Sequence, residues 1–328
     1  MTVLHPARKG KLNCHCCSGP VKKAGHFKNR NGTAQRYVCT RCGKYSSEGQ
    51  PLAGVRLDHA KVVQIVTLLA EGLGVRSTAR VCDVDPHTVL NVLETVGAGC
   101  ERLHDRLARN IKTDAVQIDE LWARVYCAQK HAPQDASEQG DQYTFLALAA
   151  REKFIISYHT GKRTLENTDI FIGDFAKRLE GRTQITTDSF KPYPEVIRQR
   201  ISDRADYAVM VKQFAPTPGL IEAKRRYSPA PFVGVSIKIK TGNPRRDRIC
   251  TSHVERQNLT VRHFNKRFAR LSLGYSKTFD NHCYAIALFV CAYNFCKVHS
   301  TLGCTPAVGV KLASETWSIE KLITEAAI

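Results

Sequence analysis

Two groups of side chains in this sequence of 328 residues have the types and spacing that metal ions need. The first group is a set of cysteines arranged as C-x2-C, a gap of 21 residues, and C-x2-C: Cys14, Cys17, Cys39 and Cys42. Four thiolates at this spacing match a closed, tetrahedral, structural Zn²⁺ site of the ribbon or knuckle kind, with Cys16 as an alternative to Cys17. We therefore predict a zinc-ribbon-like DNA-binding segment over residues 1–52; four reduced surface thiols are the other interpretation.

The second group consists of carboxylates. Asp119 lies in the middle of an alternating apolar and polar stretch, where a charge is costly without a partner or a metal ion. Asp188 ends another predicted strand, and Glu255 lies on a predicted helix. Three such carboxylates can converge on two Mg²⁺ or Mn²⁺ ions, which prefer oxygen ligands and can assist phosphodiester cleavage. Glu120 is a rival ligand, although side-chain alternation directs it to the opposite face of the strand.

A basic helical face follows Glu255. Asn258 and Arg262 come three and seven residues later, on roughly the same side of a helix. A carboxylate beside an amide and a guanidinium suits a metal ion held near a phosphate. We predict DNA contacts for Asn258, Lys266 and Arg267, with packing of the helix as the alternative for Asn258.

Upstream of the carboxylates, the apolar pattern predicts three helices between residues 57 and 107. The third begins after a plausible N-cap, Asp85, with a proline in its first position. Two short helices, a tight turn and a third helix indicate a helix-turn-helix domain over residues 53–110, which places His87, Thr88 and Asn91 near DNA. A helical linker or a dimerisation bundle is the alternative.

After residue 112 the pattern of apolar and polar residues becomes typical of strands. Three strands with short links, then a helix, a strand, a helix, a fifth strand and further helices predict an α/β domain over residues 111–300. Its sheet is expected to have five strands, of mixed direction, with flanking helices. A stretch rich in Pro, Gly, Lys and Arg, residues 213–248, is predicted to be an insertion, and residues 301–328 a C-terminal tail.

The composition favours a polyanionic partner. The sequence has 49 Lys and Arg against 30 Asp and Glu, giving a formal net charge of +19. Its longest apolar run, residues 285–293, is too short to span a bilayer, and the N-terminus has no apolar signal core. We therefore expect a cytoplasmic protein with access to DNA, no membrane contact, and cysteines used as thiols or metal ligands rather than disulfides.

Several motifs resemble one known family. Residues 118–122 (Ile-Asp-Glu-Leu-Trp), 186–189 (Thr-Thr-Asp-Ser) and 254–262 (Val-Glu-Arg-Gln-Asn-Leu-Thr-Val-Arg) are similar to those of DDE-type insertion-sequence transposases, specifically the insertion-sequence-one family. Residues 268–271, 275–277 and 293–306 resemble the C-terminal segment of that family. The four cysteines and the predicted helix-turn-helix also fit, so the resemblance covers nearly the whole chain. His253 departs from it, because an aromatic residue such as Tyr is expected there.

The resemblance implies an RNase H-like catalytic fold, with Asp119, Asp188 and Glu255 as metal ligands and Arg262 as a basic catalytic residue. It implies cleavage of DNA at the terminal inverted repeats of an insertion sequence and strand transfer to target DNA. Because two ends are joined, we expect a homo-oligomer. The alternatives are a domesticated or inactive transposase that acts as a DNA-binding protein, and an RNase H-like nuclease without strand transfer.

Overall fold

The computed structural model of the chain describes residues 14, 17, 19–29, 32–47, 57–215, 231–269 and 272–327. The chain divides into two compact units. The first comprises Met1–Leu107, Ala123–Asp141 and Thr260–Ile328, and the second comprises Ala108–Trp122 and Gln142–Leu259. These units are described separately below, and the domain boundaries expected from the sequence stay a prediction.

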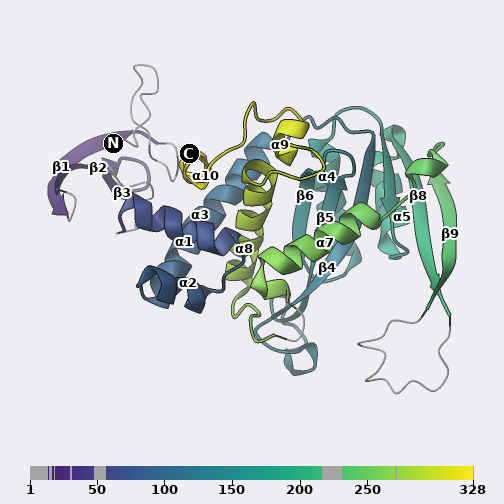
Figure 1. The fold of residues 1–328 in the computed structure, drawn as a ribbon, viewed down its shortest axis with the longest axis horizontal. Helices are drawn as coiled ribbons and strands as arrows, with labels where there is room; N and C mark the ends of the chain where they lie inside the picture. Colours follow the sequence, from purple (N-terminus) through teal and green to yellow (C-terminus); the bar gives the residue numbers. More distant parts are fainter. Residues whose placement is uncertain are drawn as a thin grey trace. The chain divides into compact units, whose positions relative to one another are not determined.

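The N-terminal part of the first unit contains a small antiparallel sheet, coloured purple in Figure 1. Its strands are β1 (Val21–Asn29), β2 (Gly32–Cys39) and β3 (Tyr45–Ser47), in the order β1-β2-β3. Between β2 and β3 the chain turns through Gly43, whose φ of +71° favours glycine because a Cβ atom is strained there. The turn therefore follows directly after the second cysteine pair.

Three helices follow: α1 (His59–Ala70), α2 (Val75–Cys82) and α3 (Pro86–Leu107). The carboxylate of Asp58 caps α1 by accepting the backbone N–H of Lys61 at 2.7 Å. Asp85 accepts the N–H of His87 at 2.7 Å, as its predicted N-cap role requires. Three successive helices are present as expected, and their use as a helix-turn-helix stays a prediction.

The first unit is completed by helices from the C-terminal part of the chain. These are α8 (Phe279–Cys291), a π-helical turn (Ala292–Cys296), α9 (Pro306–Gly309) and α10 (Ile319–Ala326). Helix α3 packs closely on α8 and α10 through two glycines: a Cβ atom on Gly97 would lie 2.5 Å from the Cβ of Tyr284, and one on Gly99 would collide with the carbonyl of Ala326. The predicted C-terminal tail thus contributes a helix to the packing of this unit.

The second unit is built on a six-stranded mixed sheet. The strands are β4 (Ala115–Val125), β5 (Gly140–Ala149), β6 (Ile155–Gly161), β7 (Thr183–Thr187), β8 (Ala205–Phe214) and β9 (Phe232–Thr241). Their order is β6-β5-β4-β7-β8-β9. Strand β7 lies parallel to both β4 and β8, whereas β5 with β6 and β8 with β9 are antiparallel. The α/β class and the five expected strands are confirmed.

The sixth strand corrects one prediction. Strand β9 lies inside residues 213–248, which were expected to form only an insertion. It pairs with β8 from Tyr207 opposite Thr241 to Phe214 opposite Phe232. Its apolar residues do alternate, but the surrounding Pro, Gly, Lys and Arg obscured this period of two. Residues 216–230 of the predicted insertion lie outside the described residues.

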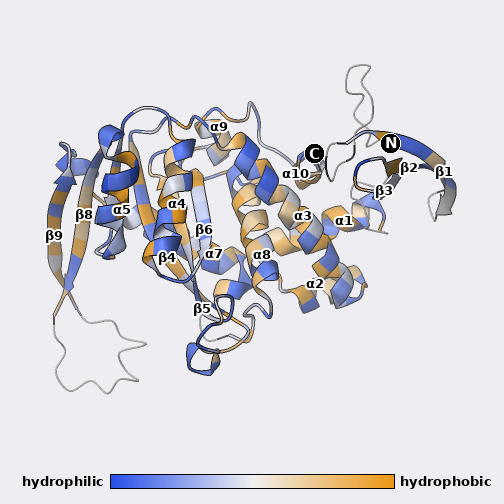
Figure 2. Cartoon of the chain, turned by 180° about the vertical axis from the view of Figure 1, so that it is seen from behind, coloured by the Kyte–Doolittle hydropathy of each residue, from blue (hydrophilic) through white to orange (hydrophobic). Residues whose placement is uncertain are grey.

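Three helices flank the sheet. Helices α4 (Leu165–Arg178) and α5 (Pro192–Ile201) lie on one face, in front of the strands in Figure 2. Helix α7 (Ser252–Phe264) crosses the other face, in front of the strands in Figure 1. The sheet core is apolar, with fully buried Phe145, Ile185 and Tyr207 among its side chains. Polar residues between these layers therefore need partners, and the carboxylates are placed there.

Candidate metal-binding sites

The pairing of β4 with β7 brings two predicted ligands together. In this parallel register Ile118 lies opposite Thr187, so the next residues, Asp119 and Asp188, come from neighbouring strands at the same level. Strand β7 ends at Thr187, and Asp188 begins the loop, where its Oδ1 accepts the N–H of Phe190 at 2.9 Å. Asp119 is half-buried, whereas the side chain of Asp188 is 41% exposed. The site therefore opens to solvent on the side of Asp188.

Glu120 joins these two aspartates. Carboxylate oxygens of Asp119, Glu120 and Asp188 lie within 4.8 Å of one another. Alternation along β4 turns Glu120 toward Tyr193 of α5, as expected, but its carboxylate still reaches the pair. Arg163 lies 3.0 Å from Glu120 and 3.7 Å from Asp188, and its guanidinium stacks over the ring of Phe190. Arg163 therefore supplies one positive charge that compensates the cluster.

Two of the carboxylates, Asp119 and Glu120, have raised pKa values. Burial raises the pKa of Asp119 to about 6, and the nearby charges of Asp188 and Glu255 act in the same direction. Burial also raises the pKa of Glu120 to about 7, with Asp188 adding to the shift and the Tyr193 hydroxyl and Arg163 opposing it. A cluster of this kind gains strongly from a bound cation, because a cation stabilises the charged form of every member.

Glu255 comes from the other face of the sheet, in the first turn of α7. Both of its oxygens lie 2.5 Å from the Nζ atom of Lys212 on β8, and Thr251 Oγ1 donates to Oε1 at 2.6 Å. Its charge is close enough to Asp119 to raise the pKa of that residue. Glu255 is nevertheless outside the group of Asp119, Glu120 and Asp188 that shares the 4.8 Å spacing.

Helix α7 is tied directly to strand β4 by two buried amides. Gln117, which is 3% exposed, accepts the N–H groups of His253 and Val254 on its Oε1 atom at 2.9 and 3.0 Å. Asn258 donates from Nδ2 to Oδ2 of Asp119 at 2.8 Å. The first contact satisfies free donors at the helix N-terminus, and the second orients a ligand. Together they fix the helix of Glu255 against the strand of Asp119.

His253, the departure from the resembled family, has its own partner. Its Nδ1 lies 2.9 Å from the Nζ of Lys153, in the turn between β5 and β6. Burial lowers the pKa of His253, and the charge of Lys153 lowers it further, so this imidazole is a neutral acceptor. The histidine thus adds one more link between α7 and the sheet.

The donor set of the acidic cluster fits a hard divalent cation. All ligand atoms are carboxylate oxygens, which Mg²⁺ and Mn²⁺ prefer, and three of them already lie within 4.8 Å of one another. The raised pKa of Asp119 shows that negative charge there lacks full compensation. Asp119, Asp188 and Glu120 could hold one ion as they stand, whereas Glu255 contacts Lys212 and Thr251 instead.

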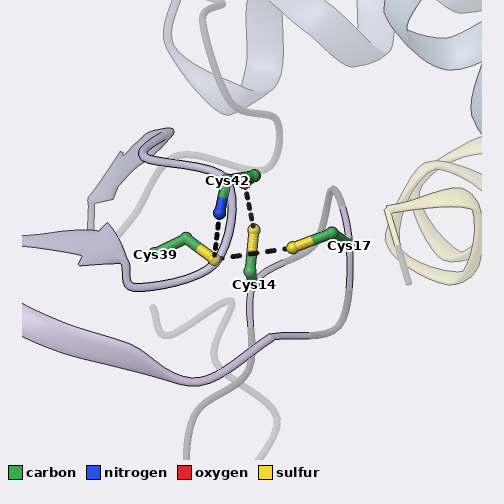
Figure 3. Close-up of side chains that lie close together, drawn as sticks. All are labelled: Cys14, Cys17, Cys39 and Cys42. Atoms are coloured by element: carbon green, nitrogen blue, oxygen red, sulfur yellow. Dashed lines mark hydrogen bonds between the residues drawn. The ribbon is translucent and has the colours of Figure 1, made fainter.

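The four predicted cysteine ligands also converge. Their side chains point toward one another from the N-terminal loop and the end of β2 (Figure 3). The sulfur of Cys14 lies 3.6 Å from that of Cys42, and the sulfur of Cys17 lies 3.5 Å from that of Cys39. Cys17 belongs to the cluster, and the alternative ligand Cys16 lies outside the described residues.

The cysteine cluster fits a tetrahedral ion. Zn–S bonds of about 2.3 Å place the sulfurs of a tetrahedral site about 3.8 Å apart, close to the observed spacing. The N–H groups of Arg41 and Cys42 point at the sulfur of Cys39 at 3.3 and 3.4 Å. The N–H of Cys42 is the main cause that lowers the pKa of Cys39 to about 6, which favours the thiolate that zinc requires. A zinc site made of these four thiolates is thus chemically possible.

Two of the residues predicted to contact DNA have internal hydrogen-bond partners. Asn258 is 4% exposed with its amide turned to Asp119, so it packs the helix against β4. Arg267 is largely enclosed: burial lowers its pKa to about 10, and its guanidinium donates to Ser276 Oγ at 3.0 Å. For Asn258 this contact agrees with the packing alternative, and the DNA contact of Arg267 stays a prediction.

The other predicted contacts belong to the first unit and stay predictions. Lys266 is exposed in a short 3₁₀ turn after α7. His87 and Asn91 are exposed and Thr88 is half-buried near the start of α3. Arg262 is half-buried in the last turn of α7, and its role beside the metal site is not tested by the contacts of either unit. Among the described residues, no helix combines the length and apolar character needed to cross a bilayer.

Comparisons with known proteins are sparse. No protein-family model and no curated protein sequence matches the chain. A cryo-EM structure of the piggyBac transposase synaptic complex with hairpin DNA is 11% identical over 82% of this chain and 69% of that chain, with a TM-score of 0.39. The Mos1 transposase paired-end complex with left transposon end is 11% identical over 72% and 77%, with a TM-score of 0.19. Identities and TM-scores this low establish neither fold nor activity, so the function rests on the site itself.

Proposed function

We propose that the protein is a DDE-type transposase that cleaves and joins DNA by metal-dependent phosphoryl transfer. The observation that carries the proposal is the position of Asp119. It lies at the level of Asp188 on the neighbouring strand, and its pKa is raised by burial and by the charges of both Asp188 and Glu255. The chain's three sequence motifs that resemble insertion-sequence-one transposases contain these same three residues.

The strand order supports an RNase H-like catalytic domain. Numbered from β4, the first five strands of this sheet are arranged 3-2-1-4-5. In that arrangement the first and fourth strands are parallel neighbours and carry the two aspartates. The glutamate follows on a helix across the sheet. The strong positive charge of the chain, +19, suits a DNA substrate.

In the proposed reaction, water attacks a phosphodiester at an element end and releases a 3′-hydroxyl, which then attacks a target phosphodiester. Asp119, Asp188 and Glu255 would bind the divalent ions, with Glu120 as a further oxygen donor. Two bound Mg²⁺ ions would activate the attacking oxygen and stabilise the leaving one. Arg262 would contact a phosphate, and the Gln117 and Asn258 hydrogen bonds would hold the ligands in place.

Recognition of the DNA is assigned to the N-terminal part of the chain. The four-cysteine segment and helices α1 to α3, used as a helix-turn-helix, would bind the terminal inverted repeats, with His87, Thr88 and Asn91 at the bases. Lys266 would contact the backbone. Because two ends are processed together, a homo-oligomer is the working form, and the site of action is the bacterial cytoplasm.

The proposal is tested with isosteric replacements of the three acids. Asp119→Asn, Asp188→Asn and Glu255→Gln should each abolish Mg²⁺-dependent cleavage of a duplex carrying the repeats that flank the gene, while binding of that duplex is retained. Asp203→Asn is the matched control, because Asp203 is exposed in a short turn outside the cluster. Full cleavage by any one of the three variants would overturn the assignment of that residue.

Strand transfer separates the proposal from its alternatives. Wild-type protein given precleaved ends and plasmid DNA should join them, which a nuclease without transfer activity cannot do. A DNA-binding protein without catalytic activity would bind the ends and neither cut nor join them in Mg²⁺. Arg262→Ala should slow cleavage while the protein still binds Mn²⁺, and an unchanged rate would exclude its phosphate role.

A further inference from the structure

Lys212 contacts Glu255, but the proposed reaction with Asp119, Asp188 and Glu255 as metal ligands gives it no role. Its Nζ atom lies 2.5 Å from both oxygens of that carboxylate. Strand β8 places it there: Ala208 and Met210, two and four residues earlier, pack with Ile249 on one face of the sheet. Alternation puts Lys212 on the same face, beside α7. Its backbone is fixed opposite Val235 of β9.

From this contact we propose that Lys212 is a phosphate-binding residue of the site, held on Glu255 until a divalent cation takes that carboxylate. The inference rests on the proposed function and extends it to a residue outside the three acids. The ammonium group of Lys212 faces both oxygens of Glu255, which is the position that a metal ion bound by both oxygens would take. Binding of the metal therefore releases an ammonium group beside the cluster, where a phosphodiester would lie.

The exposure of the pair makes this exchange easy. The side chains of Lys212 and Glu255 are 35% and 40% exposed, so water solvates both partners and the attraction between them is weak. A divalent cation bound by Asp119 and Asp188 attracts Glu255 more strongly than a single ammonium group does. Lysine suits the second role, because its flexible stem and point charge can follow a phosphate oxygen.

Arg163 is held differently, which makes Lys212 the exchangeable cation. The Glu120 partner of Arg163 is only 3% exposed, and its guanidinium stacks over Phe190 at 4.1 Å. The side chain of Arg163 is itself 37% exposed, so what fixes it is the burial of its partner Glu120 and the stacking on Phe190. The acid that Lys212 contacts is 40% exposed, because β8 leaves the core after Met210 and this end of the strand faces solvent.

The test compares DNA binding by Lys212→Met with and without Ca²⁺, using a fluorescent duplex of arbitrary sequence. In Ca²⁺ the variant should bind about tenfold more weakly than the wild type, and its log-log salt slope should be smaller by about one. In EDTA the two proteins should bind equally. Lys240→Met, an exposed lysine on β9, is the control for a loss of charge; its effect should not depend on Ca²⁺.

Glu255→Gln gives an independent arm. Without the carboxylate, Lys212 is free in the absence of metal, so Glu255→Gln should bind DNA more tightly than the wild type in EDTA, and the double variant with Lys212→Met should lose that gain. Equal losses with and without Ca²⁺, or no gain in Glu255→Gln, would overturn the Lys212 role. Calorimetry of Ca²⁺ binding separates the two proposals: if the wild type and Asp119→Asn bind alike, the metal site itself is wrong.

Discussion

Asn258 donates a hydrogen bond of 2.8 Å to Asp119 across 139 residues of sequence. The donor favours the charged form of Asp119, against the burial that raises its pKa. Removing it should therefore weaken cation binding. Asn258→Ala is expected to bind Mn²⁺ about 10- to 100-fold more weakly, the range for partners that orient metal ligands. Calorimetry of Mn²⁺ binding measures this without reference to activity.

The neighbouring residue provides the control for this prediction. Leu259 is 53% exposed on the same helix, so Leu259→Ala should leave Mn²⁺ affinity unchanged. If Asn258→Ala binds Mn²⁺ as tightly as the wild type, the amide only packs the helix and does not orient Asp119.

Gln117 makes the second link between β4 and α7. Substitutions can either remove its acceptor oxygen or keep an acceptor in its place. Gln117→Met leaves the N–H groups of His253 and Val254 without their partner and should cost about 1–3 kcal/mol. Gln117→Glu keeps an acceptor at the N-terminus of a helix, where negative charge is favourable. Hydrogen exchange of the amides at the start of α7 should speed up in the first variant and return toward wild type in the second. Equal exchange in both would show that the helix is held by other contacts.

Much of the fold of the second unit could be predicted, because its strands follow simple patterns. The stretch around Asp119 mixes apolar and polar residues in a broadly alternating pattern, and the proline at position 192 marks the start of α5. Strand β9 was missed because a composition typical of loops surrounds it. The same alternation in residues 232–241, with Val235, Ile237 and Ile239 on one face, was the signal that could have identified it.

The sequence indicates which residue types form the site, but it does not indicate which side chains contact one another there. Asp119 could be chosen because a charged residue in an apolar strand needs compensation. Lys212, Arg163 and Gln117 each contact residues that are far away in the sequence. The periodicity of a single helix or strand cannot predict such long-range contacts. Asn258 illustrates the limit, since a polar residue on a basic helix suggests DNA until its burial against Asp119 is known.

Removal of zinc should unfold the ribbon segment. Cys39→Ser takes away the thiol whose pKa the backbone lowers most clearly, so bound zinc should fall from about one ion per chain to near zero. Hydrogen exchange across β1 to β3 should become fast, and, on the proposed function, binding to the element ends should weaken. Cys304→Ser, a half-buried cysteine outside the cluster, should keep the zinc. Absence of zinc from purified wild-type protein would contradict the prediction.

His282 should make the first unit sensitive to acid. It is fully buried, its Nδ1 lies 2.9 Å from Ser276 Oγ, and burial together with the charge of Arg267 lowers its pKa to about 3. The unfolded chain takes up a proton near pH 6.5 and the folded one does not. Stability is therefore complete above pH 6.5 and falls by about 1.4 kcal/mol per pH unit from there toward pH 3.

Replacing this histidine should flatten the pH dependence. Between pH 6.5 and pH 5.0, His282→Leu should lose about 2 kcal/mol less stability than the wild type, whatever its stability at neutral pH. Urea unfolding followed by the fluorescence of Trp317, in a Trp122→Phe background, reports on the first unit, because the sequence has only these two tryptophans. His131→Leu, at an exposed position, should follow the wild-type slope. Parallel pH profiles for His282→Leu and the wild type would mean that the buried imidazole does not set the acid limit.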